Sequence, residues 1–138
     1  MNETILITGA NAGLGKDAAR QLALNSETKK IFLGCRNEKK ALEAKADLEQ
    51  ITGRSIFEIM IVDVSKPDSV RRAIANLEDP VDALIMNAGG MGGKNPETIT
   101  SDGVTSIFAT NVLGHVIMVD ELLKANKLKN VAMYASSE

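Results

Sequence analysis

The amino-acid sequence predicts an α/β protein with a doubly wound parallel sheet, in which five strands take the order 3-2-1-4-5. Two observations lead to this fold class. Short apolar runs alternate with amphipathic segments of helical length, and the runs are apolar at nearly every position. Strands of that kind are covered on both faces, and right-handed crossovers place helices on each side of the sheet. We therefore expect a three-layer domain over residues 1–138.

The predicted elements follow one another along the chain as strand and helix in turn. Strands are expected at residues 4–8, 30–35, 56–62, 82–86 and 130–135, and helices at 12–25, 37–53, 65–77 and 102–124. Asn37 is a suitable N-cap for the second helix, and Gly53 stands where a helix-ending glycine belongs. Ser65 and Asp68, with Pro67 between them, predict a capping box at the start of the third helix.

Composition excludes several classes of function. The net charge of −2 indicates no basic surface for nucleic acid, and the longest apolar runs have the length of strands, not of membrane spans. The single cysteine, Cys35, excludes an internal disulfide, and no signal peptide is visible, so we expect a cytoplasmic protein. The only histidine, His115, has no cluster of ligating residues beside it. We expect it to be a packing or helix-surface residue, and we expect no metal site.

The segment TGANAGLGK, residues 8–16, lies between the first strand and the first helix. Gly9, Gly13 and Gly15 allow a sharp turn there and let a phosphate approach the backbone closely. The helix that follows presents free N–H groups and the positive end of its dipole to that phosphate. A glycine-rich turn without a ligand is the alternative. The position of the motif between strand and helix favours the dinucleotide-binding interpretation.

The end of the second strand bears on the choice of cofactor. In dinucleotide-binding folds, an acidic residue near this point binds the ribose 2′-hydroxyl of NAD. Here the residues are Cys35, Arg36 and Asn37, so the expected acidic residue is absent and the segment carries a guanidinium instead. Arg36 suits a 2′-phosphate, which favours NADP(H) over NAD(H); a solvated loop charge is the alternative. Lys16 adds positive charge to the site or is an ordinary helix-surface lysine.

In this order, the motifs resemble those of the short-chain dehydrogenase/reductase family, whose members are Rossmann-type oxidoreductases. TGANAGLG is similar to the family's T-G-x-x-x-G-x-G loop, VDVS to its segment after the third strand, and MNAGG to its N-N-A-G motif. The resemblance implies that Asp63 meets the adenine amino group and Val64 the adenine ring. Together with Arg36, the implied cofactor-binding residues are Thr8, Gly9, Asn11, Ala12, Gly13, Leu14, Gly15, Asp63, Val64, Asn87, Ala88 and Gly89.

Two further motifs concern catalysis. TNVLGH is similar to the helical segment that carries the family's structural and catalytic asparagine, here Asn111, and YASSE to the strand end that carries its catalytic serine. Alignment places that serine at Ser137, with Ser136 as the alternative. Taken singly, Asp63, Asn87 and Asn111 also fit ordinary loop or helix roles. GANAGLGK, GCRNEKK and TSDGVTSIFATNVLGH resemble the retinol dehydrogenase and protochlorophyllide reductase-like branch, which generally uses NADP(H).

The family's proton donor, a Tyr-x-x-x-Lys pair, is absent from the sequence. Tyr134 is the only tyrosine, belongs to the last predicted strand, and is followed four residues later by Glu138. The resemblance covers the whole chain but only about the N-terminal half of a family member, so we expect the domain to be incomplete at its C-terminus. It implies an NADP(H)-dependent oxidoreductase for an alcohol or carbonyl substrate, inactive as these residues alone. A non-catalytic NADP(H)-binding sensor or scaffold is the alternative.

The last predicted helix, residues 102–124, is apolar around most of its circumference. One side can pack on the sheet, and the other needs a partner. Family members commonly pair through this helix, so the resemblance implies a homodimer. Further chain beyond the given residues would cover the same side.

Overall fold

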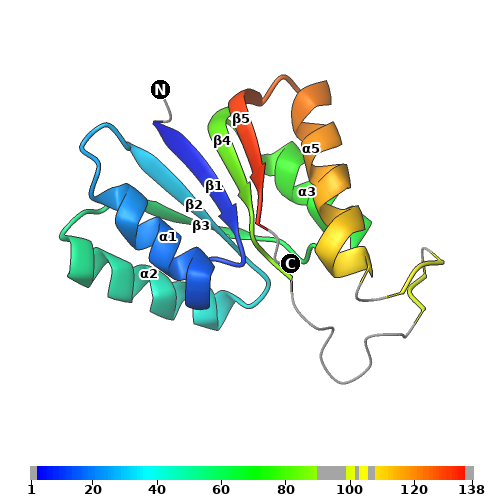
Figure 1. Cartoon of the computed structure of the whole chain (residues 1–138), viewed down its shortest axis with the longest axis horizontal. Helices are drawn as coiled ribbons and strands as arrows, with labels where there is room; N and C mark the ends of the chain where they lie inside the picture. The colour runs from blue at the N-terminus through cyan, green and yellow to red at the C-terminus, as the bar shows by residue number, and fades with distance from the viewer. Residues whose placement is uncertain (1–2, 90–98, 102, 106–107, 136–138) are drawn as a thin grey trace.

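A computed structural model describes residues 3–89, 99–101, 103–105 and 108–135 as a parallel sheet with helices on both faces (Figure 1). The strands are β1 (Thr4–Thr8), β2 (Lys30–Cys35), β3 (Phe57–Ile61), β4 (Val81–Met86) and β5 (Leu128–Tyr134). The helices are α1 (Gly13–Ala23), α2 (Glu38–Thr52), α3 (Pro67–Asn76), the π-helix η1 (Ala109–Leu113) and α5 (Gly114–Lys124). The strand order is β3-β2-β1-β4-β5, so the predicted fold class and strand order are confirmed.

The continuous apolar strands are explained by two separate cores, one on each face of the sheet. Ile5 and Ile7 of β1 pack with residues of α1 and α2, whereas Leu6 between them packs with residues of α3 and α5. Figure 1 shows the corresponding layers, with α1 and α2 on one face and α3 and α5 on the other. Because successive side chains point to opposite faces, a strand buried on both sides needs an apolar residue at every position.

The ends of α2 follow the sequence prediction. Asn37 accepts a hydrogen bond through its side-chain oxygen from the Lys40 backbone N–H at 3.0 Å. Gly53 ends the helix with φ +67°, a left-handed conformation that glycine adopts without steric cost. Both predicted caps of α2 are confirmed.

The capping box predicted for α3 is wrong. Ser65 donates its hydroxyl to the Asp63 carboxylate at 2.6 Å instead of capping the helix. The N-cap is Lys66, whose side chain caps nothing. The charge-assisted bond to the Asp63 carboxylate orients the Ser65 hydroxyl toward the loop and not toward the start of the helix. The Ser65 hydroxyl therefore stabilises the loop after β3, and the start of α3 has no side-chain cap.

The last helical segment begins with a wide turn. Residues 109–113 form η1, and α5 continues from Gly114 without a break; residues 102, 106 and 107 of the predicted helix lie outside the described residues. A Cβ at position 114 would lie 1.8 Å from the Val64 carbonyl oxygen. The backbone of α5 therefore passes directly over the loop after β3, an approach that only glycine permits.

The β5 side of the sheet is open to solvent. β5 begins at Leu128, two residues before its predicted start, and its side chains are largely exposed, with Met133 at 58%. Val116 and Leu123, on the side of α5 away from the core, are 58% and 60% exposed, which matches the predicted uncovered side of this helix. Among the described residues, no helix is both long and apolar enough to cross a bilayer.

Candidate functional site

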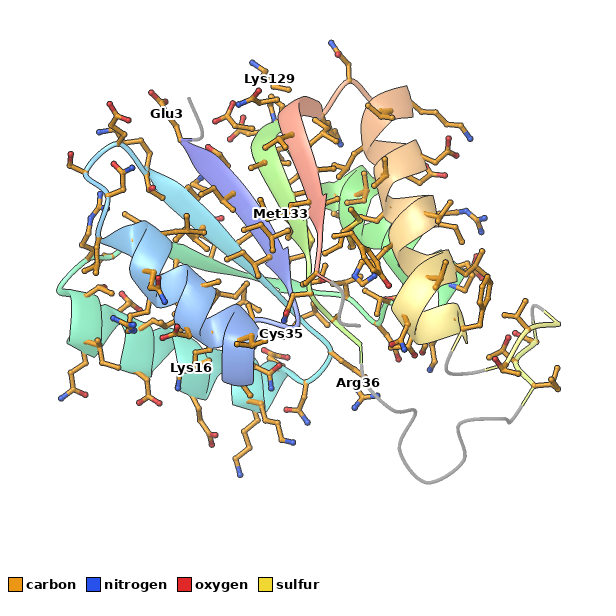
Figure 2. The ribbon with its side chains drawn as sticks, in the orientation of Figure 1. Glu3, Lys16, Cys35, Arg36, Lys129 and Met133 are labelled. Carbon is orange, nitrogen blue, oxygen red and sulfur yellow. The ribbon has the colours of Figure 1, made fainter. Side chains whose placement is uncertain are left out.

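A cleft of about 400 Å³ lies at the carboxyl ends of β1 to β4. This is the place where doubly wound sheets bind ligands, because β1 and β4 run to the same end while their connecting helices leave toward opposite faces. Figure 2 shows Cys35 and Arg36 at this end of the sheet and Glu3 and Lys129 at the other. The cleft is lined by Gly9, Asn11, Ala12, Gly13, Gly34, Cys35, Arg36, Val62, Asp63, Val64, Asn87, Ala88, Gly89 and Thr110.

The structure thus brings together ten of the predicted cofactor residues, but three lie elsewhere. Thr8 is buried beneath the cleft, Gly15 is buried in α1, and Leu14 points to solvent in the first turn of α1. Lys16 forms an ion pair with Asp47 of α2 at 2.9 Å and does not line the cleft. It is the helix-surface lysine that the sequence left as one of two alternatives.

The glycines of the first turn serve different purposes. Gly13 has φ +57°, and no atom would lie within 4 Å of a Cβ placed there, so this residue leaves open space in the cleft. A Cβ on Gly15 would lie 2.3 Å from the Gly9 carbonyl oxygen and 2.6 Å from the Asn87 side-chain nitrogen. Gly15 therefore allows α1 to pack closely on the turn, whereas Gly13 allows a ligand to approach the backbone.

The start of α1 is not capped by a side chain. Its N-cap residue is Ala12, and the first turn carries no acidic side chain. The first backbone N–H groups of a helix have no partner within it, and the helix dipole adds partial positive charge at this end. The open start of α1 therefore offers donors and positive potential to an anion in the cleft, which fits a pyrophosphate.

Two charged residues stand among those that line the cleft, Arg36 and Asp63. Arg36 is exposed, directly after β2, and no ion pair with another described residue neutralises it. Its neighbour Cys35 adds no charge, because burial raises the pKa of that thiol to about 11. The rim at the end of β2 is therefore cationic.

Asp63 is held in place by the loop after β3. Its Oδ1 accepts hydrogen bonds from the Ser65 N–H at 3.0 Å and from the Ser65 hydroxyl, and its own N–H donates to the Ser69 hydroxyl at 2.9 Å. Within the described part of the chain, no such bond engages Oδ2. An oriented carboxylate with one oxygen available suits an amino group as ligand.

The floor of the cleft is organised by Thr8, the last residue of β1. Its hydroxyl oxygen accepts the backbone N–H groups of Asn87 at 3.0 Å and Ala88 at 2.9 Å. The Asn87 side-chain amide donates to the Gly9 carbonyl at 3.4 Å. These bonds tie the segment 87–89 to the glycine turn, so two walls of the cleft are joined through the end of β1.

The predicted catalytic asparagine lies beside the cleft. Asn111 sits within η1 next to Thr110, and a Cβ on Gly89 would lie 2.7 Å from its side-chain oxygen. Its backbone carbonyl accepts the hydroxyl of Tyr134, which therefore does more than pack in the strand. Single π-turns within helices are common at functional sites. The predicted serines, Ser136 and Ser137, lie outside the described residues.

One residue near the site was not predicted to be part of it. His115 is 1% exposed, and its Nε2 lies 2.8 Å from the Thr8 hydroxyl oxygen. Its ring meets the Tyr134 ring edge to face, with centroids 5.9 Å apart. The sequence shows a histidine among apolar residues, but its partner is 107 positions away, so the pairing could not be read from local pattern.

A second hollow, of about 490 Å³, runs along the edge strand β3, beside the start of β2 and the end of α3. It is lined by Lys30, Glu58, Glu78 and Asp79 among others, with none of the predicted site residues and no helix start. An anionic cofactor would meet acidic side chains there. The cleft at the carboxyl ends of the strands is therefore the better candidate, although it is the smaller of the two.

The strand order, together with the glycine turn between β1 and α1, defines a Rossmann-like α/β protein. Residues 3–133 match the family model described as short chain dehydrogenase, which covers nearly the whole chain. The chain therefore belongs to the short-chain dehydrogenase/reductase family, whose members are NAD(P)(H)-dependent oxidoreductases. The family expected from the sequence motifs is confirmed.

Named relatives agree with this placement. The chain is 36% identical to dehydrogenase/reductase SDR family member 12 of Bos taurus over 86% of its own length, and 35% identical to retinol dehydrogenase 13 of Homo sapiens over 92%. It spans only 37% and 38% of those two proteins. An alcohol dehydrogenase of the archaeon Thermococcus sibiricus, solved with 5-hydroxy-NADP, matches with a TM-score of 0.75 and 26% identity, covering 98% of this chain and 58% of that one.

Proposed function

We propose that this chain is the NADP(H)-binding domain of a short-chain oxidoreductase that acts on an alcohol or carbonyl substrate. The observation that carries the proposal is the cleft itself, in which an open glycine backbone, an uncapped helix start and a cationic rim face one space. Each suits a different part of a phosphorylated dinucleotide. The archaeal relative solved with an NADP derivative supports the same assignment.

Each part of the cleft has a role in this proposal. The start of α1 and the backbone at Gly13 bind the pyrophosphate, Arg36 pairs with the 2′-phosphate, and Asp63 with Val64 receives the adenine. The segment 87–89, directly after β4, forms a further wall of the cleft. Bound there, the dinucleotide would supply the hydride-carrying nicotinamide ring. Asn111 and Ser137 remain the proposed catalytic residues on the substrate side.

A second candidate function, a sensor or scaffold that binds NADP(H) without catalysis, is favoured by one observation. The Tyr134 hydroxyl is donated to the Asn111 backbone carbonyl, so this phenol is engaged in a structural bond beside the cleft. Both candidates predict binding without turnover by these residues alone. They differ for the longer protein, which turns over alcohols or carbonyls only in the first case.

The binding proposal is tested by calorimetric titration of the chain with NADP⁺ and NAD⁺. We expect NADP⁺ to bind more tightly, and Arg36→Ala to weaken NADP⁺ binding by about ten- to a hundredfold, the usual range for hydrogen bonds to a charged group. NAD⁺ binding should not change. Arg72→Ala, which removes an exposed arginine on α3, is the matched control and should alter neither. Equal affinity for both cofactors would refute the role of Arg36, and binding of neither would refute the site.

The uncovered side of α5 leads to a further part of the proposal, which is pairing with a second copy of the chain. Val116 and Leu123 stand exposed along this side, and Val112 continues it into η1. Sedimentation equilibrium of the chain and of a Val116→Glu variant distinguishes the outcomes. A dimer that the charge dissociates supports pairing through α5, and a monomer over the whole concentration range excludes it.

A further inference from the structure

The bonding of Thr8 determines the protonation state of His115. A hydroxyl oxygen accepts two hydrogen bonds, and both positions on Thr8 are taken by the N–H groups of Asn87 and Ala88. The hydroxyl proton must therefore go to the remaining partner, His115 Nε2 at 2.8 Å. Nε2 is thus an acceptor, and the ring is neutral with its proton on Nδ1. This tautomer is assigned from the hydrogen-bond network.

The surroundings of the ring favour the neutral form. Nδ1 is buried and makes no hydrogen bond within the usual distance and angle limits. Burial lowers the pKa of His115, and the nearby Asn111 backbone carbonyl only partly offsets this effect. Two titratable groups, Asp120 of α5 and Tyr134 of β5, line the same apolar hollow of about 470 Å³. Asp120 is already paired with Lys124 at 2.8 Å, so no free carboxylate faces the ring from α5.

The other elements packed against α5 also leave the ring without a charged partner. On α3, Arg71 pairs with Glu121 at 3.7 Å. In the loop after β3, Asp63 is bonded to Ser65 through Oδ1, and no hydrogen bond or ion pair between described residues joins it to His115. β1 and β4 contribute Thr8 and Met86, which carry no charge.

Protonation of His115 would break the arrangement at the floor of the cleft. A charged ring has N–H groups at both nitrogens, so Nε2 could no longer accept the Thr8 hydroxyl. The Thr8 oxygen would then face three N–H donors with two acceptor positions, and the bond to Asn87 or to Ala88 would be lost. These are the bonds that hold the segment 87–89 against the end of β1.

We propose that His115 is a positioning residue for the dinucleotide: as a neutral acceptor for the Thr8 hydroxyl it fixes the segment 87–89, and its protonation loosens that wall of the cleft. This inference rests on the proposed cofactor function. It adds a role for a side chain that does not line the cleft itself, and a dependence of cofactor affinity on pH.

The first test needs no ligand. Because the sequence contains one histidine, the imidazole region of a nitrogen-15 spectrum of the untagged chain reports His115 alone. At pH 7.5 we expect a neutral ring protonated on Nδ1. In a Thr8→Val variant the preference for that tautomer should be lost. A ring protonated on Nε2, or a charged ring, would overturn the proposal.

The second test measures NADP⁺ affinity by calorimetry. His115→Leu leaves the Thr8 hydroxyl without an acceptor and should weaken binding about tenfold, the usual value for one lost hydrogen bond. His115→Gln places a side-chain oxygen where Nε2 stands and should restore most of the affinity. Met118→Leu, a volume-conserving change at a buried residue of the same helix, is the matched control and should bind like the wild type.

The pH profile separates positioning from packing. Because the 2′-phosphate of the cofactor itself titrates near pH 6, the quantity to follow is the ratio of the wild-type to the His115→Gln affinity. Because burial lowers the pKa of His115, we expect this ratio to be constant above pH 6.5, the ordinary histidine value, and to fall below that pH as the ring becomes protonated. If His115→Leu does not fold, the ratio still decides the question.

Three results would overturn the inference: a flat ratio, a His115→Leu variant that binds like the wild type, or a His115→Gln variant as weak as His115→Leu. A wild-type chain that binds no dinucleotide while its ring shows the expected tautomer refutes the proposed function and the cofactor role of His115 together. It leaves the bond between Thr8 and His115 as a purely structural feature.

Discussion

The two halves of the sheet differ in how fully their side chains are buried. Around β1 and β2, strand residues such as Ile7 and Leu33 are fully buried. The carbonyl end of α1 is bonded as well, because the Arg54 guanidinium donates to the carbonyls of Ala23 at 2.7 Å and Asn25 at 3.0 Å. Around β5, Met133 is 58% exposed. The glycine turn belongs to the closed half and Asn111 to the open one.

This difference separates the two tasks of the proposed site. The closed half presents backbone groups at fixed positions, which is what a phosphorylated ligand requires, and its precision comes from close backbone contacts at glycines. The open half presents side chains near a sparsely covered edge. We therefore expect cofactor binding to depend on the first half, and completion of the substrate side to depend on whatever covers the second.

The largest expected effect is at the contact that joins the two halves. Gly114→Ala would place a Cβ 1.8 Å from the Val64 carbonyl oxygen, so α5 has to move away from the loop after β3. We expect a loss of about 3 kcal/mol in the free energy of unfolding, measured with urea. Lys124→Ala, an exposed change on the same helix that removes only a surface ion pair with Asp120, should leave the free energy of unfolding nearly unchanged. A loss below about 1 kcal/mol for Gly114→Ala would show that the contact is not tight.

The next prediction compares the reactivity of a single thiol in each half of the sheet at pH 8. Cys35 is 2% exposed, and its pKa is raised to about 11, so roughly one thiol in a thousand is ionised and almost none is accessible. A cysteine at position 133, in a chain with Cys35→Ala, should react with a disulfide reagent at least about a hundredfold faster. In denaturant the two rates should converge. A slow Met133→Cys variant would mean that β5 is covered in solution, as by a second copy.

The smallest effect separates backbone strain from ligand contact. Gly13 and Gly53 have φ +57° and +67°, and a Cβ at either would meet nothing within 4 Å. Gly13→Ala and Gly53→Ala should each cost about 1 kcal/mol of stability, because alanine is strained in that conformation. Only Gly13→Ala should also weaken NADP⁺ binding. Equal NADP⁺ affinities for the two variants would place the phosphate away from Gly13.

Much of this architecture was predictable because its causes are local. Continuous apolar runs mark strands buried on both faces, and Asn37 and Gly53 have one physical use each at the ends of α2. The glycine turn and the residue after β2 stand at the ends of strands that any doubly wound sheet brings together. For the same reason, ten of the thirteen predicted cofactor residues meet in one cleft.

The parts that differ from the prediction depend on which partner each side chain bonds. The capping box at Ser65 failed because the bond to the Asp63 carboxylate orients the Ser65 hydroxyl toward the loop. Thr8 was predicted as a cofactor contact but supports the segment 87–89 from below. His115 is buried, as one of the two expected alternatives has it, but its bond to Thr8 could not be seen in the sequence around it.

The π-turn η1 has a consequence for the register of everything that follows it. A π-turn holds one more residue than the α-helical turn it replaces, and each residue in a helix corresponds to a rotation of about 100°. Deleting one residue from 109–113 would therefore change the phase of α5 and carry Met118 and Leu122, both 0% exposed, out of the core. Shortening the wide turn to an α-helical turn therefore requires a different apolar pattern along the whole of α5.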